Sequence, residues 1–199
     1  MQKSRQLLLV AAVAATALAL SGCSAGNGGM PGMDHASDDP TASGSQVAAD
    51  FNDADAAFAQ MMIPHHEQAV EMSDMLLAKD GIDQRVAELA AQIKDAQQPE
   101  IDQLRDWLID WGQEEADMGG MNHGGMMSDD DMTALEAAEG AEAARLFLEQ
   151  MTEHHEGAIA MAEAEADDGR NENAKGMAAT IVATQTDEIA RMQQLLASL

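Results

Sequence analysis

Apolar side chains recur at helical spacing along four stretches of the chain. In the first stretch they follow one another at alternating intervals of four and three residues, from Phe58 to Leu76, and in the second from Val86 to Trp111. The apolar positions of a third stretch end near Glu165, and a fourth stretch occupies residues 174–199. These intervals place the apolar residues of each stretch on one helical face. Since no alternating strand pattern competes with them, we predict an all-α fold.

Capping residues and glycines set the expected ends of these helices. Asn52 or Asp53 suits the N-cap of the first helix, and Gly112 follows the last residue of the second. The third helix is expected to begin at residues 128–131, where acidic side chains favour a helix N-terminus. Pro64 and Pro99 lie inside the first two stretches, so each predicts a bend or a new helix start.

The helical pattern occurs twice. Residues 62–72, MIPHHEQAVEM, match residues 151–161, MTEHHEGAIAM, at an offset of 89 positions. The second and fourth stretches share the pattern I-x-x-x-Q-x-x-E-I, which begins at Ile93 and Ile181. The repeated unit is therefore a helical hairpin. Two such hairpins predict a ferritin-like four-helix bundle.

Each copy of the repeat brings adjacent histidines together with methionines at helical spacing. The spacing places His65 and His154 on the apolar stripes, with His66 and His155 at their edges. Imidazole and thioether groups suit copper, and thioethers favour Cu(I). Core methionines and hydrogen-bonded core histidines would give the same spacing in one helix, but packing alone rarely requires His-His-Glu twice. The candidate metal ligands in the bundle are His65, His66, His154, His155, Met62, Met72, Met151 and Met161.

Four polar residues interrupt the other two apolar stripes: Gln97, Glu100, Gln185 and Glu188. Buried polar groups require partners, since an unsatisfied one costs about 1–3 kcal/mol. We expect them to orient His65 and His154 as supporting residues around a metal. Direct ligation in a carboxylate-bridged dimetal centre is the alternative. That centre usually carries Glu-x-x-His on two helices, which this chain lacks.

Two Gly-rich, acidic segments contain further methionines and histidines. Large apolar side chains in such segments have no evident core to fill, so we expect them to capture Cu(I) or Ag(I) reversibly. A linker without a metal-binding role is the alternative. The candidate ligands are Met30, Met33 and His35 in the first segment, and Met118, Met121, His123, Met126 and Met127 in the second.

The first 22 residues form a signal-peptide pattern. Lys3 and Arg5 precede an apolar run that is too short for a membrane span, and Leu20 to Cys23 resembles a bacterial lipobox. This predicts lipid attachment at Cys23 and an extracytoplasmic protein anchored to the membrane. The expected organisation is a signal peptide at 1–22, a flexible tether at 23–50 and a bundle domain at 51–199 with a Met/His-rich linker at 113–130.

Cysteine content and charge exclude several classes of function. Cys23 is the sole cysteine among the 199 residues, so an intrachain disulfide and Cys-based metal or nucleophile sites are ruled out. The formal net charge of −26 repels nucleic acid and anionic lipid headgroups. Cations are the partners that this charge attracts.

The two His-His-Glu hairpins and the I-x-x-x-Q-x-x-E-I pattern resemble the domain-of-unknown-function 305 family over residues 51–199. The resemblance implies a ferritin-like four-helix fold and an extracytoplasmic bacterial protein, and some members bind copper. The Met-Gly-Gly-Met-Asn-His linker is typical of copper-handling members. Carried over by position, the implied ligands are the four histidines of the repeat and their neighbouring methionines.

The leading functional hypothesis is a lipid-anchored protein that sequesters or transfers copper without catalysis. A ferritin-like dimetal oxidase using Glu100 and Glu188, or a metal-free structural lipoprotein, are the alternatives. A hemerythrin-like oxygen site is disfavoured because no motif histidine has a glutamate four residues later. The metal stoichiometry, the oxidation state and any protein partner for copper transfer stay open.

Overall fold

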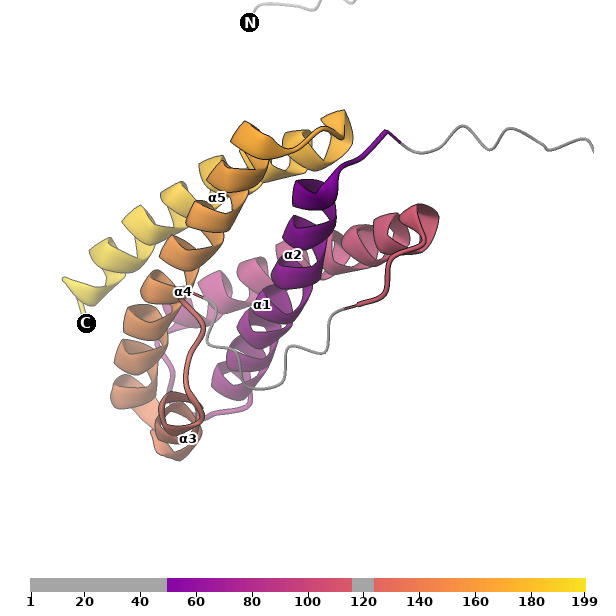
Figure 1. Ribbon diagram of the computed structural model, residues 1–199. Coiled ribbons are helices and arrows are strands. Elements are labelled where there is room, and N and C mark those ends of the chain that lie inside the picture. Colours follow the sequence, from indigo (N-terminus) through magenta and orange to yellow (C-terminus); the bar gives the residue numbers. More distant parts are fainter. Residues whose placement is uncertain (1–49, 116–123) are drawn as a thin grey trace, which may run out of the picture. The chain divides into compact units, whose positions relative to one another are not determined.

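The computed structural model of the chain describes residues 50–115 and 124–199. Within these ranges it contains five helices and no strand, which confirms the all-α prediction (Figure 1). None of these helices is long and apolar enough to cross a membrane. The helices are α1 (Asp53–Leu77), α2 (Gln84–Trp111), α3 (Asp129–Ala137), α4 (Gly140–Asp168) and α5 (Glu172–Leu196).

The predicted start of the first helix and the predicted end of the second are confirmed. Asn52 caps α1, and its side chain accepts hydrogen bonds from the backbone N–H groups of Ala54 and Asp55. Gly112 ends α2 with a φ of 66°, a left-handed conformation that favours glycine. Both helices continue across their prolines, so neither starts anew at Pro64 or Pro99. A bend at either proline stays a prediction.

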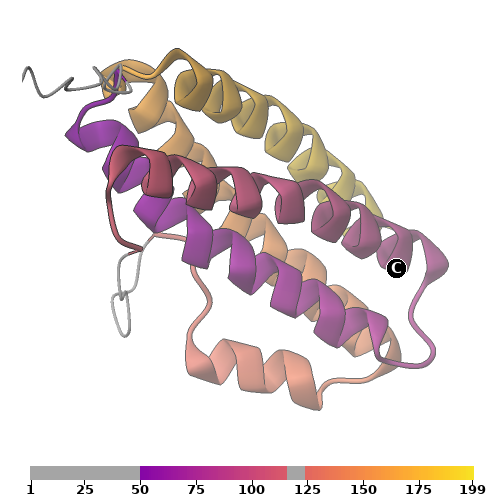
Figure 2. The ribbon, with the colours of Figure 1, turned by 90° about the vertical axis from the view of Figure 1, so that its right-hand side faces the viewer.

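The third predicted helix is in fact two helices, so this expectation was wrong. Ser128 caps α3 through the backbone N–H of Asp131, as the acidic start of the stretch suggested. The chain leaves the helical conformation at Ala138, which is extended, and Gly140 then adopts a φ of 53°. A left-handed residue interrupts the i to i−4 hydrogen-bond ladder. The short α3 therefore runs in a different direction from α4 (Figure 2).

The four long helices form two hairpins, α1–α2 and α4–α5, which pack together through α1 and α4 (Figure 2). The N-terminal half of α1 shares a hydrophobic cluster with the C-terminal half of α4, where Phe58 and Met62 lie with Ala158 and Ala162. The opposite halves form a second cluster. α1 and α4 are therefore antiparallel, as expected for duplicated hairpins. The short α3 contacts both of them on the side of the second cluster.

Polar residues separate the two hydrophobic clusters on every long helix. On α1 the apolar positions up to Ile63 belong to the first cluster and those from Ala69 to the second, with His65 and His66 between them. The same order recurs on α2, α4 and α5, where glutamine and glutamate or the second histidine pair occupy the intervening positions. We call this set the polar layer: His65, His66, Gln97, Glu100, His154, His155, Gln185 and Glu188.

Aromatic rings close one end of the bundle. Phe51 stacks on Trp111 with ring centroids 4.9 Å apart, and Trp107 stacks on the same Trp111 at 5.9 Å. Both tryptophans therefore pack at this end of the bundle.

Candidate metal centre

The helices α1 and α4 place all four motif histidines in the interior, and each is fully buried. His66 and His155, which were expected at the edges of the apolar stripes, are buried as completely as His65 and His154. α1 and α4 are each covered on two sides, by their own hairpin partner and by each other. Neighbouring residues on a helix point about 100° apart, so one histidine of each pair faces the opposite hairpin while the next faces its own partner helix.

His65 and His154 are the pair that meets at the contact between the hairpins. Their ring centroids lie 3.7 Å apart with an interplanar angle of 41°. Burial, followed by the nearby rings of His65, His155 and His66, holds the pKa of His154 well below its usual 6.5. His154 is therefore a neutral imidazole at neutral pH, the form that binds a metal ion.

His66 and His155 each form a hydrogen bond with a glutamate of their own hairpin. Nε2 of His66 lies 2.8 Å from Oε2 of Glu100, and Nε2 of His155 lies 2.7 Å from Oε2 of Glu188. Since an ionised carboxylate only accepts hydrogen bonds, Nε2 carries the proton in each pair. Nδ1 then holds the free electron pair, and neither Nδ1 has a hydrogen-bond partner among the described residues.

Glu100 and Glu188 each hydrogen-bond a histidine, but not the histidine that was predicted. Glu100 and Glu188 were expected to support His65 and His154, whereas they hold His66 and His155. The helical stripe alone could not reveal this, because it shows which face is buried but not which neighbouring helix covers it. Gln97 and Gln185 are buried as expected, and both amide atoms of Gln97 lack a partner within the described part of the chain.

The motif methionines flank the polar layer on both sides. Met62 belongs to the first hydrophobic cluster, and Met72 and Met151 belong to the second; all three are fully buried. Met161 is half-buried and packs against the first cluster. Thioethers thus lie above and below the histidines, although they also fill the core, as the packing interpretation predicts.

Met127 departs from the expectation that linker methionines have no core to fill. It is 8% exposed and belongs to the second hydrophobic cluster, while Met126 is half-buried. The Gln68 side chain holds the Met127 backbone at both ends, accepting from its N–H at 2.7 Å and donating to its C=O at 2.9 Å. The remaining candidates lie outside the described residues: Cys23, Met30, Met33, His35, Met118, Met121 and His123.

The polar layer offers nitrogen donors but no ready-made cage of hard ligands. Across residues 50–115 and 124–199, no three His, Cys, Asp or Glu side chains are arranged to hold a metal ion. Thioethers fall outside that set of ligands. A soft ion that takes two or three nitrogen and sulfur ligands fits these donors better than an ion that needs carboxylates.

Proteins of known structure share this fold. A family model, Domain of unknown function (DUF305), matches residues 55–196. The chain belongs to the DUF305 family. A DUF305 fragment from Deinococcus radiodurans is 29% identical with a TM-score of 0.68, and the match covers 74% of this chain and 98% of that one. A DUF305 protein from Streptomyces coelicolor is 35% identical with a TM-score of 0.67, and the match covers 73% and 93%.

This DUF305 chain is also similar to CopM, a protein whose structures hold Cu(I), Cu(II) or Ag. The Cu(II)-bound form is 28% identical with a TM-score of 0.64, and the match covers 72% of this chain and 96% of CopM. No protein with curated annotation matches significantly.

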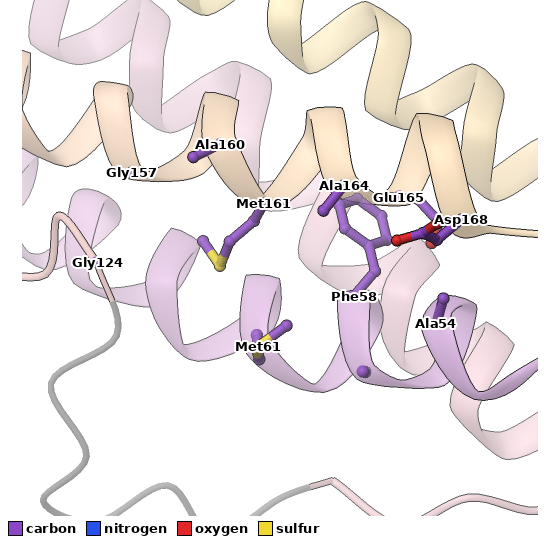
Figure 3. A pocket seen from close by; sticks show the side chains of 11 residues that line it. Ala54, Phe58, Met61, Gly124, Gly157, Ala160, Met161, Ala164, Glu165 and Asp168 are labelled. Carbon is purple, nitrogen blue, oxygen red and sulfur yellow. The ribbon is translucent and has the colours of Figure 1, made fainter.

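The sequence patterns did not reveal a groove between α1 and α4 (Figure 3). It has a volume of about 390 Å³, and its lining includes Phe58, Met61, Gly124, Met161 and Glu165. Met61 precedes the first motif and has glutamine at the equivalent position of the second copy, so the repeat itself offered a signal. We define the open groove by its lining residues: Ala54, Ala57, Phe58, Met61, Gly124, Gly157, Ala160, Met161, Ala164, Glu165 and Asp168.

Proposed function

We propose that this DUF305 protein binds copper ions and that the polar layer is one of its binding sites. The observation that carries the proposal is the pair of Glu–His hydrogen bonds, Glu100 with His66 and Glu188 with His155. Metal-binding histidines usually donate their other ring N–H to a carboxylate, which fixes the ring and raises its basicity. Each pair leaves a buried Nδ1 that has no hydrogen-bond partner within residues 50–115 and 124–199, and that is the atom which a metal ion would use.

The donor set favours copper over zinc or iron. Neutral imidazole suits Cu(I) and Cu(II), and the thioethers of Met62, Met72 and Met151 on either side of the layer suit Cu(I) and Ag(I). Similarity to CopM, which binds Cu(I), Cu(II) and Ag, supports the same range of ions. Since the His65 and His154 rings already face each other at 3.7 Å, an ion bound by both requires the rings to turn.

We further propose a binding role without catalysis, in an extracytoplasmic protein that is lipid-anchored through Cys23. The lipobox-like sequence at Leu20 to Cys23 supports the anchor, and the acidic surface would concentrate cations near the protein. A dimetal oxidase is less well supported, because Glu100 and Glu188 are each engaged by a histidine of their own hairpin. Whether the protein stores copper or passes it to a partner is a further question for experiment.

The carboxylates provide the sharpest test. The full chain, stripped of metal, is titrated with Cu(II) and with Cu(I) in competition with chelators of known affinity. Glu100→Gln combined with Glu188→Gln is expected to weaken binding to the polar layer about 10- to 100-fold. Electron paramagnetic resonance of the Cu(II) form is expected to show nitrogen coupling that His66→Ala combined with His155→Ala removes.

The matched control is Glu67→Gln, because Glu67 directly follows His66 but is exposed and paired with Arg105. This variant is expected to bind copper as the unchanged protein does. Circular dichroism and urea unfolding establish that each variant still folds. Copper affinity and nitrogen coupling that survive in the folded glutamate and histidine variants would refute the polar-layer site.

A further inference from the structure

The duplicated hairpins present two equivalent surfaces along the contact between α1 and α4. Residues 89 positions apart correspond, so Phe58 matches Phe147 and Met161 matches Met72. The first surface is the open groove of Figure 3. The second contains Met72 and Phe147 and lies under α3, whose Leu135 is fully buried there, and we call it the covered groove. A residue type that one groove has and the other lacks is not required by the fold.

Two buried carboxyl groups at one end of the open groove have no counterpart in the covered groove. Glu165 is 2% exposed, and Asp55 is fully buried. Their equivalents 89 positions away are Leu76 and Ala144, both fully buried in the second hydrophobic cluster. Apolar side chains fill these positions of the covered groove at no polar cost. The carboxyl pair is therefore specific to the open groove.

The surrounding backbone satisfies only one of the two carboxyl groups. Asp55 accepts hydrogen bonds from the backbone N–H groups of Asn52 at 2.6 Å and of Asn171 at 2.8 Å. Within the described part of the chain, no N–H or O–H group donates to either carboxyl oxygen of Glu165. A buried acceptor without a donor requires an explanation. A ligand that supplies the donor is one.

The charged groups around Glu165 leave its end of the groove negative. Asp55 of α1 is its neighbour, and Figure 3 shows Asp168 of α4 beside it. Positive charge comes from Lys175 of α5, whose ammonium group donates to the C=O of Gly169 at 3.2 Å. Burial and Asp55 outweigh Lys175, so the pKa of Glu165 is raised to about 8. A further positive charge beside Glu165 would favour its ionised form.

The rest of the open groove is apolar. Figure 3 shows the Phe58 ring near Glu165, with Met61 of α1 and Met161 of α4 further along the hollow. The remaining apolar lining consists of alanines and glycines. The part of α1 that lines the groove spans about two helical turns, or about 10 Å. A volume of about 390 Å³, apolar walls and a few polar groups at one end are typical of small-molecule sites.

We propose that the open groove binds a small amphiphilic cation, a primary amine whose apolar chain lies between Met61 and Met161 and whose ammonium group donates hydrogen bonds to Glu165. An ammonium group has three N–H donors and no acceptor, so it matches a carboxyl group that lacks donors. An anionic amphiphile would bring a further negative charge to Asp55 and Asp168. No residue of the polar layer lines this groove, and the inference does not depend on copper binding.

Three eight-carbon probes test the recognition on the full chain at pH 7, with a chelator present to remove metal ions. n-Octylamine, 1-octanol and octanoate share the same apolar chain and differ in the charge of the head group. Calorimetry is expected to show the amine binding about tenfold more tightly than the alcohol, and octanoate binding more weakly than either. Equal affinities for amine and alcohol, or no binding of the amine at millimolar concentration, would overturn the proposal.

Glu165→Gln removes the carboxyl group while keeping the shape of the side chain. It is expected to weaken binding of octylamine about tenfold and to leave binding of octanol unchanged. The matched control is Glu163→Gln on the exposed face of α4, which is expected to bind both probes as the unchanged protein does. Circular dichroism establishes that each variant folds. Unchanged affinity for the amine in folded Glu165→Gln would contradict the assigned role of the carboxyl group.

NMR of methionine methyl groups locates the bound amine. The signals of Met61 and Met161 are expected to shift on titration with octylamine, whereas that of Met132, half-buried beside the second cluster, is not. Ala160→Phe fills the groove and is expected to abolish the shifts, and Ala179→Phe, at an exposed position of α5, is the control. Shifts that persist in Ala160→Phe would show binding elsewhere. A dimer in sedimentation that Ala160→Phe dissociates would show that a second copy occupies the groove, and either result rejects the proposal.

Proton release on binding is a signature that a purely apolar groove would not give. With a pKa of about 8, Glu165 is mostly protonated at pH 7, and an ammonium group bound beside it favours loss of that proton. Calorimetry in buffers of different ionisation enthalpy is expected to show protons released by the unchanged protein and none by Glu165→Gln. Binding without proton release in the unchanged protein would place the ammonium group away from Glu165 and overturn the assignment.

Discussion

Glu165 carries the most sharply testable electrostatic feature of the fold. It is 2% exposed at one end of the open groove. Burial first, and then the neighbouring carboxyl of Asp55, raise the pKa of Glu165 from about 4.5 to about 8. Burial would also raise the pKa of Asp55, but the backbone N–H groups of Asn171, Asn52 and Arg170, together with Glu165, outweigh it and lower that pKa. Asp55 is therefore the ionised member of the pair, and Glu165 keeps its proton at neutral pH.

These shifts make stability fall as pH rises. Below pH 4.5, Glu165 is protonated in the folded and the unfolded chain alike. Between pH 4.5 and about 8 the unfolded chain loses this proton while the folded protein retains it, so the free energy of unfolding decreases with pH. Each pKa unit corresponds to about 1.4 kcal/mol, which sets an upper limit of about 5 kcal/mol. Asp55 stays ionised above its ordinary pKa of 3.8 and adds no slope in this window.

Glu165→Gln removes this titration while keeping the shape of the side chain. We expect the unfolding free energy of the variant, minus that of the unchanged protein, to grow steadily from pH 5 to pH 8. Urea unfolding followed by circular dichroism, with a chelator present, measures it, and other titrating groups cancel in the difference. Glu163→Gln, an exposed neighbour on the same helix, is expected to give a flat difference. A flat difference for Glu165→Gln as well would refute the raised pKa of Glu165.

Two further predictions concern how the linker is anchored. Gly157→Ala is expected to cost about 1–3 kcal/mol of stability, because the new Cβ would lie 2.7 Å from the Gly125 Cα, a backbone atom that cannot turn aside as a side chain does. Gly112→Ala is the comparison. Its Cβ meets open space, so this variant is expected to lose only about 1 kcal/mol, through its positive φ. Gln68→Leu is expected to cost about 1–3 kcal/mol by leaving both polar groups of the Met127 backbone unsatisfied. Urea unfolding checks all three, and a Gly157→Ala loss no larger than that of Gly112→Ala would contradict the close packing.

The periodic features of the chain could be predicted from the sequence because they depend on local geometry. Helical spacing located the four long helices, and the 89-residue offset paired His65 with His154 across the hairpins, where the rings do meet. Burial of Gln97 and Gln185 followed from the same stripes. Each of these inferences needs only the position of a residue on its own helix.

Features that depend on a neighbouring helix could not be predicted in this way. Which carboxylate binds which histidine depends on how α2 and α5 pack against their partners, and the stripe carries no such information. The break before Gly140 was missed because one glycine within a helical pattern is often tolerated. Without that break α3 could not turn to cover the second hydrophobic cluster. The burial of Met127 in the same cluster was missed because it too depends on this turn of the chain.

The asymmetry between the two grooves follows from how the duplicated hairpins are joined. A two-fold arrangement of identical hairpins presents the same groove twice, but a single linker runs from the end of α2 to the start of α4. This linker forms α3 over the groove beside the start of α4, so the equivalent groove at the other end has no second α3 to cover it. The polar layer lies between the two grooves and has the same residue types in both repeats. The groove positions differ, because Gln68 of the first repeat aligns with Gly157 of the second, and Met61 aligns with Gln150. The covered groove thus encloses part of the second hydrophobic cluster, whereas no helix of the described ranges covers the open one.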